Sequence, residues 1–479
     1  MFVHKYPYII YREFSENGYL TDNRNFGYDT ASNSSVKLGD LLLSKEGSIF
    51  YAQLENNPLE ISAIVDKLSV IFIGVTRERL LEDTLKFFQS LAEKGFVCCC
   101  ESNDASLDKY QPIFSYENRV PHNIETKSDE LLFPVHNVFG GQYCLTRVHV
   151  DVSSRCNENC VHCYIPTHNK NSIMAEDIFD KVLAECVKMK VLNITLSGGE
   201  PMLNPHFKTF LQKSVKENMS VNILSNLTLL TTELLDVIVS NPLISVQTSL
   251  YAMDEHVHDL ITQKPGSFKR TKDGILRLRE RNVPMQINCP IMKQNLQYYR
   301  DVLDFAKSLN IESSADYSLF GCYDGSCSNI NCRIDLTDVK CLLENDYSNN
   351  QKLAEVIDVV KQKRVDDDDP ICSICKSSLC VSNTGEVYPC EGWQRMILGN
   401  IVDQSLDEIW TNNAKTTHLR DLKFKDIDKC RTCQIRKYCT TCLIMNANET
   451  PSNNYMSVNP YVCAMARVKQ QTIELKKQN

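Results

Sequence analysis

Hydrophobic and polar positions change their pattern near residue 145. Beyond that point, six short apolar segments alternate with longer segments that have the spacing of helices. Strands separated by helix-length segments predict βα units and a parallel sheet. We therefore expect an α/β fold, a partial (β/α)6 TIM barrel, over residues 144–340, with strands at Thr146 to Val152, Leu192 to Leu196, Ser220 to Leu224, Ile244 to Leu250, Pro284 to Cys289 and Ser314 to Leu319.

The chain before residue 145 has a different pattern. Residues 36–97 alternate apolar segments typical of strands with one amphipathic helix, whose apolar residues recur at helical spacing from Leu80 to Ala92, before Gly95. This pattern predicts a small winged-helix-like domain within residues 1–100. Residues 101–143 show little periodicity and are rich in turn-forming residues, so they are expected to be a linker.

The C-terminal part begins with a charged break. Residues 366–369 are four consecutive aspartates, which are typical of a solvated connector, here placed at residues 341–371. The remaining residues, 372–479, form a separate cysteine-rich domain that ends in a Lys-rich polar tail.

Charge and hydropathy restrict the partners. The formal net charge is -8 and no long basic run occurs, so nucleic acid is not expected as a partner. The first residues do not resemble a secretory signal, and no stretch of about 18 apolar residues predicts a membrane span. A cytoplasmic protein is expected. In that compartment, 22 cysteines arranged partly in tight clusters favour metal binding over a disulfide scaffold.

The first cysteine cluster follows the first predicted barrel strand. Cys156, Cys160 and Cys163 have the spacing C-x3-C-x2-C. Three thiolates on a 4Fe-4S cube leave one iron open, and an open iron can chelate the amino and carboxylate groups of S-adenosylmethionine (SAM). A zinc site is the alternative, but it needs a fourth ligand, and the only candidate, His162, is adjacent to Cys163. The iron-sulfur interpretation is therefore favoured.

This cluster resembles that of the radical SAM superfamily. Two further features match: His162 before the third cysteine, and residues 197–201, Ser-Gly-Gly-Glu-Pro, after the second strand. The resemblance implies SAM cleavage to methionine and a 5′-deoxyadenosyl radical, driven by an electron donor such as flavodoxin or ferredoxin. It also implies that the SAM ammonium lies at Gly198, Gly199 and Glu200, where glycines allow close backbone approach and a carboxylate pairs with a cation.

Two strand-end residues resemble the family less closely. Asn226 corresponds to a polar residue after the third strand, and Ser249 to a fourth-strand residue near the SAM ribose. Each is equally well interpreted as a strand-end group that is satisfied by local hydrogen bonds. His256 and His258, beyond the fourth strand, are expected to be surface or capping residues.

The second cysteine region resembles the SPASM extension of radical SAM enzymes, which carries two auxiliary 4Fe-4S clusters and would bring the total to three. The family pattern implies a first auxiliary cluster on Cys372, Cys375, Cys390 and Cys442, and a second on Cys430, Cys433, Cys439 and Cys463. One departure is the two-residue gap before Cys442, where the family usually has three. The extra thiol of Cys380 leaves open whether it replaces Cys372 or whether the first cluster keeps an open iron. Two zinc sites are the alternative.

The remaining candidates concern acid–base chemistry and unassigned thiols. Glu391 follows Cys390 where sulfatase-maturating relatives carry a catalytic aspartate, and a carboxylate there can take a substrate proton, although an ordinary surface glutamate fits equally well. The loop after the sixth strand contains Cys322, Cys327 and Cys332, which either contact substrate or are reduced surface thiols. Packing roles are expected for Cys98, Cys99, Cys100, Cys186 and Cys289.

The domain order suggests the substrate. Residues 36–97 look like a RiPP recognition element, the module that binds the leader of a ribosomally made precursor peptide by β-strand addition. With the other two domains, the chain resembles SPASM-type peptide maturases that install thioether crosslinks between a Cys sulfur and a carbon. The alternatives are another peptide modification, such as a carbon–carbon crosslink, epimerisation or decarboxylation; a formylglycine-forming sulfatase maturase; and a noncatalytic iron-sulfur or zinc scaffold.

Overall fold

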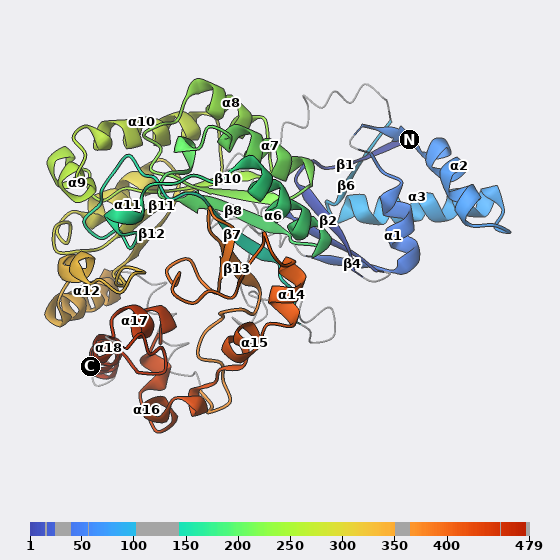
Figure 1. Cartoon of the computed structure of the whole chain (residues 1–479). Helices are drawn as coiled ribbons and strands as arrows, with labels where there is room; N and C mark the ends of the chain where they lie inside the picture. Colours follow the sequence, from blue (N-terminus) through green and yellow to red (C-terminus); the bar gives the residue numbers. More distant parts are fainter. Residues whose placement is uncertain are drawn as a thin grey trace.

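The computed structural model shows a central barrel with an N-terminal domain at one end and a cysteine-rich C-terminal region along its side, below it in this view (Figure 1). It describes residues 1–14, 17–23, 40–55, 57–101, 143–349, 365–450 and 452–475. Residues 102–142 of the predicted linker and residues 350–364 of the predicted connector lie outside the described residues.

Six parallel strands form the barrel, in the order in which they occur along the chain. The first five lie within two residues of their predicted positions. The sixth strand, β12, is shifted from its predicted position and runs from Glu312 to Asp316. Its residues are mostly polar, so a pattern of apolar segments does not locate it. It pairs with β11 at the barrel edge. The strands are β7 (Arg147–Ser153), β8 (Asn193–Gly198), β9 (Ser220–Leu224), β10 (Ile244–Ser249), β11 (Met285–Pro290) and β12 (Glu312–Asp316).

Helices cover the outside of these strands (Figure 1). Each buries one apolar face, as amphipathic surface helices do. The rings of Phe179 and Phe210, from the first two helices, stack with centroids 4.0 Å apart over the sheet. The helices are α6 (Glu176–Lys188), α7 (Phe207–Lys216), α8 (Thr232–Val239), α9 (Glu255–Thr262), α10 (Ser267–Glu280) and α11 (Tyr299–Ser308).

The second cysteine region extends the same sheet. Strand β13 (Ser378–Val381) pairs in parallel with β7, and β14 (Glu386–Tyr388) and β15 (Gly399–Asn400) follow it to give nine strands. The prediction of a separate domain did not include this pairing. Cys380 is the register partner of His149, so the hairpin lies beside the first barrel strand. The helices of this part are α12 (Leu336–Asn349), α14 (Leu406–Thr411), α15 (Ala414–Asp421), α16 (Asp428–Arg431), α17 (Leu443–Asn448) and α18 (Pro460–Leu475).

The described residues of the N-terminal domain form two small sheets and three helices. The prediction of one helix was wrong, because the apolar, β-branched segment Ile61–Ile71 is helical rather than extended. The domain also begins at residue 2, since β1 pairs with both β5 and β6. Its elements are β1 (Phe2–Lys5), β2 (Ile9–Phe14), β3 (Asn17–Asp22), β4 (Leu41–Leu43), α1 (Lys45–Ala52), β5 (Leu59–Glu60), α2 (Ile61–Ile71), α3 (Arg77–Glu93) and β6 (Val97–Cys100).

Buried polar contacts join this domain to the barrel. The Arg12 guanidinium donates to the carbonyls of Val191, at 3.0 and 2.9 Å, and Asn218, at 3.0 Å. Asn23 donates to the Pro242 carbonyl at 2.9 Å. These three carbonyls lie just before β8, β9 and β10. The N-terminal domain therefore packs against the amino ends of the barrel strands. None of the helices in the described segments has the length and apolar character needed to cross a membrane.

Candidate active site

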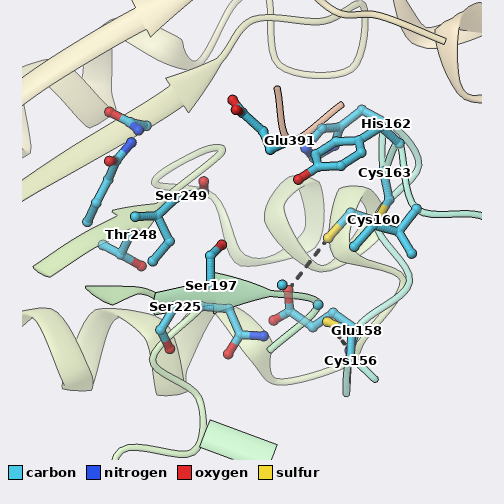
Figure 2. Close-up of a pocket in the computed structure, with 18 of the residues that line it drawn as sticks. Cys156, Glu158, Cys160, His162, Cys163, Ser197, Ser225, Thr248, Ser249 and Glu391 are labelled. Carbon is cyan, nitrogen blue, oxygen red and sulfur yellow. Dashed lines mark hydrogen bonds between the residues drawn. The ribbon is translucent and has the colours of Figure 1, made fainter. Parts of the chain in front are cut away.

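A cavity of about 570 Å³ opens at the carboxyl ends of the barrel strands. Ligand sites of parallel α/β folds lie at this end. Figure 2 shows the three cysteines of the first cluster, Glu391 and strand-end side chains around one space. Among the residues predicted for the radical SAM site and for acid–base chemistry, those that line the cavity are Cys156, Cys160, His162, Cys163, Gly198, Gly199, Asn226, Ser249 and Glu391.

The cysteine loop after β7 is anchored by its backbone. Asn159 and Val161 donate to the carbonyls of Thr262 and Ile261 at the end of α9, at 3.0 and 2.9 Å. Burial raises the pKa of Cys156 to about 12 and shifts the pKa of Cys160 in the same direction. These thiols are therefore neutral without a cation nearby. Iron supplies the positive charge that converts such thiols to thiolate ligands.

Four buried polar atoms in the cavity wall have no hydrogen-bond partner among the described residues: Glu158 Oε1, His162 Nδ1, Thr248 Oγ1 and His258 Nε2. Buried polar groups are almost always hydrogen-bonded in folded proteins. These atoms therefore fit a polar ligand that donates and accepts around its surface. SAM has that character, with an ammonium, a carboxylate, ribose hydroxyls and an adenine.

His162 and His258 are neutral at physiological pH, because burial lowers the pKa of each to about 4. His162 Nε2 lies 3.4 Å from the Tyr251 hydroxyl. The expectation that His258 lies at the surface was wrong. It is 1% exposed, and its Nδ1 accepts from the Tyr251 backbone at 3.3 Å, since α9 turns this face toward the barrel. His256 is exposed, as predicted.

The two glycines after β8 are needed for close packing. Gly198 has φ +124°, and a Cβ there would lie 1.9 Å from the Ser153 carbonyl oxygen. A Cβ on Gly199 would lie 2.4 Å from the Arg155 carbonyl oxygen. The motif predicts that these glycines allow a ligand to approach the backbone. The structure shows that they allow the end of β8 to approach the cysteine loop, where the Gly199 amide donates to Ser153 at 2.6 Å.

Glu200 lies fully buried and is not among the residues that line the cavity. Its Oε1 accepts from the Met202 amide at 3.0 Å and the Ser225 hydroxyl at 2.8 Å, and its Oε2 accepts from the Asn226 amide at 2.9 Å. Burial raises its pKa to about 7 against the opposing effect of these hydrogen bonds. The carboxyl group thus joins the ends of β8 and β9, and its contact with a SAM ammonium stays a prediction.

Asn226 links this network to the cysteine loop. Its side-chain amide donates to Asn157 Oδ1 at 3.0 Å, and its Oδ1 accepts from Thr228 Oγ1 at 2.7 Å. Both predicted strand-end residues therefore lie at the cavity, while local hydrogen bonds occupy the polar atoms of Asn226. Cofactor-binding roles for Asn226 and Ser249 stay predictions.

The predicted ligands of the first auxiliary cluster lie near one another. Cys390 interacts electrostatically with Cys442 and Cys372, and Cys372 with Cys375. Cys380 adjoins the same group, because it interacts with both Cys390 and Cys375. The structure thus brings Cys380 to the site without removing Cys372 from it, and the choice between them stays open.

The predicted ligands of the second auxiliary cluster also gather. Cys430 interacts electrostatically with Cys439, Cys463 and Cys433. Across the described segments, no three His, Cys, Asp or Glu side chains meet closely enough to share one metal ion. The thiolates of a 4Fe-4S cube bind different iron atoms. All 22 cysteines are free of disulfides.

Glu391 lies between the cavity and the auxiliary cysteines. Its Oε2 accepts from the Cys390 thiol at 3.4 Å and from the Cys380 thiol at 3.9 Å. It also lines the cavity that contains the first cysteine cluster. The structure therefore places Glu391 as a half-buried residue at the edge of the cavity, and its acid–base role stays a prediction.

The loop after β12 joins the barrel to the C-terminal helices. Arg333 pairs with Glu449 at 2.7 Å, and both side chains are less than 10% exposed. In the same loop the Cys322 thiol donates to the Cys163 carbonyl at 3.5 Å. Cys322 and Cys332 are buried, so the expectation of surface thiols was wrong for them. The expected packing role is confirmed for the buried Cys98, Cys186 and Cys289.

Sequence reasoning missed a ring of polar side chains inside the barrel. Parallel strands that are covered on both faces are usually almost continuously apolar. Polar residues at inward positions of several successive strands were therefore an available signal. Those that line the cavity are His149, Thr195, Asn222, Gln247 and Asn288.

Comparisons with known families agree with this geometry. Residues 150–306 match the radical SAM superfamily, and residues 372–434 match SPASM, an iron-sulfur cluster-binding domain. The chain is 26% identical to an AdoMet-dependent heme synthase of Methanosarcina barkeri, over 65% of this chain and 94% of that protein. It is 23% identical to the subtilosin biosynthesis protein AlbA of Bacillus subtilis, over 73% of this chain and 75% of that protein.

The whole fold is similar to a solved structure. The crystal structure of Streptococcus suis SuiB bound to its precursor peptide SuiA superposes with a TM-score of 0.58, at 16% identity, and covers 96% of this chain and 100% of that one. Because the superposition covers 96% of this chain, the likeness includes the N-terminal domain as well as the barrel and the cysteine-rich region. Residues 150–306 thus form a radical SAM domain, and residues 372–434 form a SPASM domain.

Proposed function

We propose that this enzyme removes a hydrogen atom from a ribosomally made precursor peptide and joins a peptide Cys sulfur to the resulting carbon as a thioether. One observation carries the proposal. A single cavity is lined by the first cysteine cluster and by Glu391, whose carboxylate contacts two thiols of the SPASM region. A substrate in this cavity would lie between the place where a radical is generated and the place where an electron is accepted.

The residues that would hold the cofactors follow from the same geometry. Cys156, Cys160 and Cys163 would hold a 4Fe-4S cluster with SAM on its open iron, and two auxiliary 4Fe-4S clusters would occupy the SPASM cysteines. When bound, SAM and the first cluster supply the 5′-deoxyadenosyl radical. The orphan polar atoms at Thr248 and His258 are the candidate contacts for the polar groups of SAM.

The chain itself contributes positioning and acid–base groups. The barrel wall and the loop after β12 surround the cavity, so a reactive radical would be kept from bulk water. Glu391 is our candidate for an acid–base group at the end of the cavity that faces the auxiliary cysteines. Its carboxylate lies beside the Cys380 and Cys390 thiols, where it can assist proton transfer.

A groove in the N-terminal domain is the candidate leader site. It measures about 510 Å³ and lies between β4 and α3, with apolar walls that include Leu43, Phe72 and Phe87. Strand β4 is the last strand of its sheet among the described residues, so it offers an open edge for strand addition. Nearby apolar side chains are unusually exposed, with Ile73 at 91% and Val75 at 41%. Such a surface suits an extended peptide with apolar side chains.

The relatives support a peptide substrate. AlbA acts in the biosynthesis of a bacteriocin, and SuiB has been solved with a precursor peptide. An AdoMet-dependent heme synthase is also among the similar proteins, so this likeness alone does not select a peptide substrate. The apolar groove in the N-terminal domain favours a peptide as the substrate of this enzyme. A cytoplasmic location and an electron donor such as flavodoxin or ferredoxin complete the proposal, since free cysteines and iron-sulfur clusters suit a reducing compartment.

Co-expression with a candidate precursor peptide encoded beside the gene, followed by mass spectrometry, tests the proposal. We expect a loss of two mass units per crosslink and peptide cysteines that no longer react with an alkylating reagent. The variant Cys160→Ala is the control and should leave the peptide unchanged. An unchanged peptide mass with deuterium gained from heavy water would instead show epimerisation and overturn the thioether proposal.

A further inference from the structure

His149 and Asp151 form a fixed pair on the inner face of β7. His149 Nε2 lies 3.1 Å from Asp151 Oδ1. The other carboxylate oxygen, Oδ2, accepts from the side chain of Gln394 at 3.2 Å. Asp151 is 5% exposed. Both of its oxygens are therefore engaged, and the imidazole ring is held in one orientation.

The free nitrogen of His149 is available to a substrate. Because Nε2 donates its proton to Asp151, Nδ1 carries the lone pair of the neutral ring. Within the described part of the chain, Nδ1 has no hydrogen-bond partner. The side chain is 15% exposed and lines the catalytic cavity. A basic nitrogen thus borders the space where the substrate would lie.

The surroundings of His149 stabilise its protonated form. Burial lowers its pKa, but the hydrogen bond and the charge of Asp151, together with the charge of Glu391, outweigh burial and raise it overall. Cys380 of β13 and Thr195 of β8 are its register partners on either side. No Lys or Arg is among the residues that shift its pKa.

Asp151 also borders a second, polar cavity of about 190 Å³. Its walls are mainly hydroxyl and amide side chains, such as Ser153, Asn383 and Tyr388, and they extend to the exposed Asn171. A space of this size and polarity has room for several water molecules. Water in this space would give a proton on the pair a way out on the side of Asp151.

We propose that His149, oriented by Asp151, accepts the proton that the substrate thiol releases as the carbon–sulfur bond forms. The inference rests on the proposed thioether function. The substrate C–H bond gives its hydrogen atom to the 5′-deoxyadenosyl radical, and the S–H bond gives its proton to His149 Nδ1. Carbon and sulfur then join, and the one remaining electron passes to an auxiliary iron-sulfur cluster. Glu391 acts on this step through its charge, which stabilises the imidazolium.

The variant His149→Gln separates proton transfer from radical formation. We expect 5′-deoxyadenosine to form within about twofold of the wild-type rate, whereas crosslinked peptide per 5′-deoxyadenosine falls by about 100-fold, the usual effect of losing a general base. Asp151→Asn should lower the same ratio. The matched control His256→Gln changes an exposed histidine outside the cavity and should give the wild-type ratio.

Chemical rescue distinguishes proton transfer from a structural role. In His149→Gly, added imidazole should restore the ratio of crosslink to 5′-deoxyadenosine. A wild-type ratio in His149→Gln would overturn the role of His149 while leaving the thioether function intact. The role of His149 would also be overturned if His149→Gln lost 5′-deoxyadenosine formation and imidazole did not rescue His149→Gly. If the wild-type enzyme left the mass of the peptide unchanged, the thioether function and this proton transfer would both be overturned.

Discussion

The catalytic cavity and the N-terminal groove differ in position and in chemistry. The cavity lies at the carboxyl ends of the barrel strands, and its wall contains buried polar atoms without partners. The groove is largely apolar and belongs to a domain that packs on the amino ends of the same strands. The proposed sites of catalysis and of leader recognition thus lie at opposite ends of the barrel. This arrangement predicts that SAM cleavage and leader binding can each be abolished by a substitution that leaves the other unchanged.

The largest effect is expected at the first cysteine cluster. Cys156→Ala should abolish formation of 5′-deoxyadenosine, because two thiolates cannot hold a cube with one open iron. Binding of a fluorescent leader peptide, measured by anisotropy, should stay within about twofold of wild type because the groove is unchanged. A parallel loss of leader binding would contradict the separation of the two sites.

A large but local effect is expected at Gly198. Gly198→Ala forces a Cβ against the Ser153 carbonyl at a backbone angle that L-residues avoid, so we expect a loss of roughly 3 kcal/mol in the free energy of unfolding. Denaturant titration measures it. Gly266→Ala is the matched control, since Gly266 also has positive φ (+77°) but its Cβ would meet nothing within 4 Å. It should cost only about 1 kcal/mol. If both variants lost the same free energy of unfolding, close packing of Gly198 against the cysteine loop would not contribute to stability.

An intermediate effect is expected in the groove. Val75→Glu places a charge in the apolar wall and should weaken leader binding by about tenfold, equivalent to about 1.4 kcal/mol. The SAM cleavage that occurs without peptide should not change. Val70→Glu, at a site that is 77% exposed and outside the groove, is the control. If both variants bind the leader as wild type does, the groove is not the leader site.

The smallest effect is expected at Glu391. Glu391→Gln removes a charge but keeps the shape of the side chain, so we expect a decrease of about tenfold or less in crosslink per 5′-deoxyadenosine, smaller than that of His149→Gln. Quantitative mass spectrometry of peptide and nucleoside gives the ratio. A larger decrease than in His149→Gln would reverse the roles of the two residues.

The sequence predicted the elements that follow simple patterns. Apolar strands such as Ser220–Leu224 were located correctly, and the cysteine spacings indicated both metal-binding regions. It failed where tertiary pairing decides the structure. Strand β12 is polar and owes its extent to pairing with β11, and Ile61–Ile71 is helical because its apolar face packs in the domain core.

Only part of the site was predicted, again because tertiary contacts decide the rest. Motif residues near the cysteines were found, because their spacing along the chain is fixed. His149 was missed, because Gln394 and Glu391, which lie far from it in the sequence, are brought near the His149–Asp151 pair only by the fold. Glu200 was assigned a direct contact, but the structure shows that its oxygens accept from three neighbours within the protein.

The most direct test of the central claim follows one hydrogen atom. A precursor peptide deuterated at all its carbon positions is incubated with the reduced wild-type enzyme and SAM in ordinary water. The account predicts one deuterium in 5′-deoxyadenosine for each thioether formed in the peptide. Crosslinked peptide accompanied by 5′-deoxyadenosine without deuterium would contradict it.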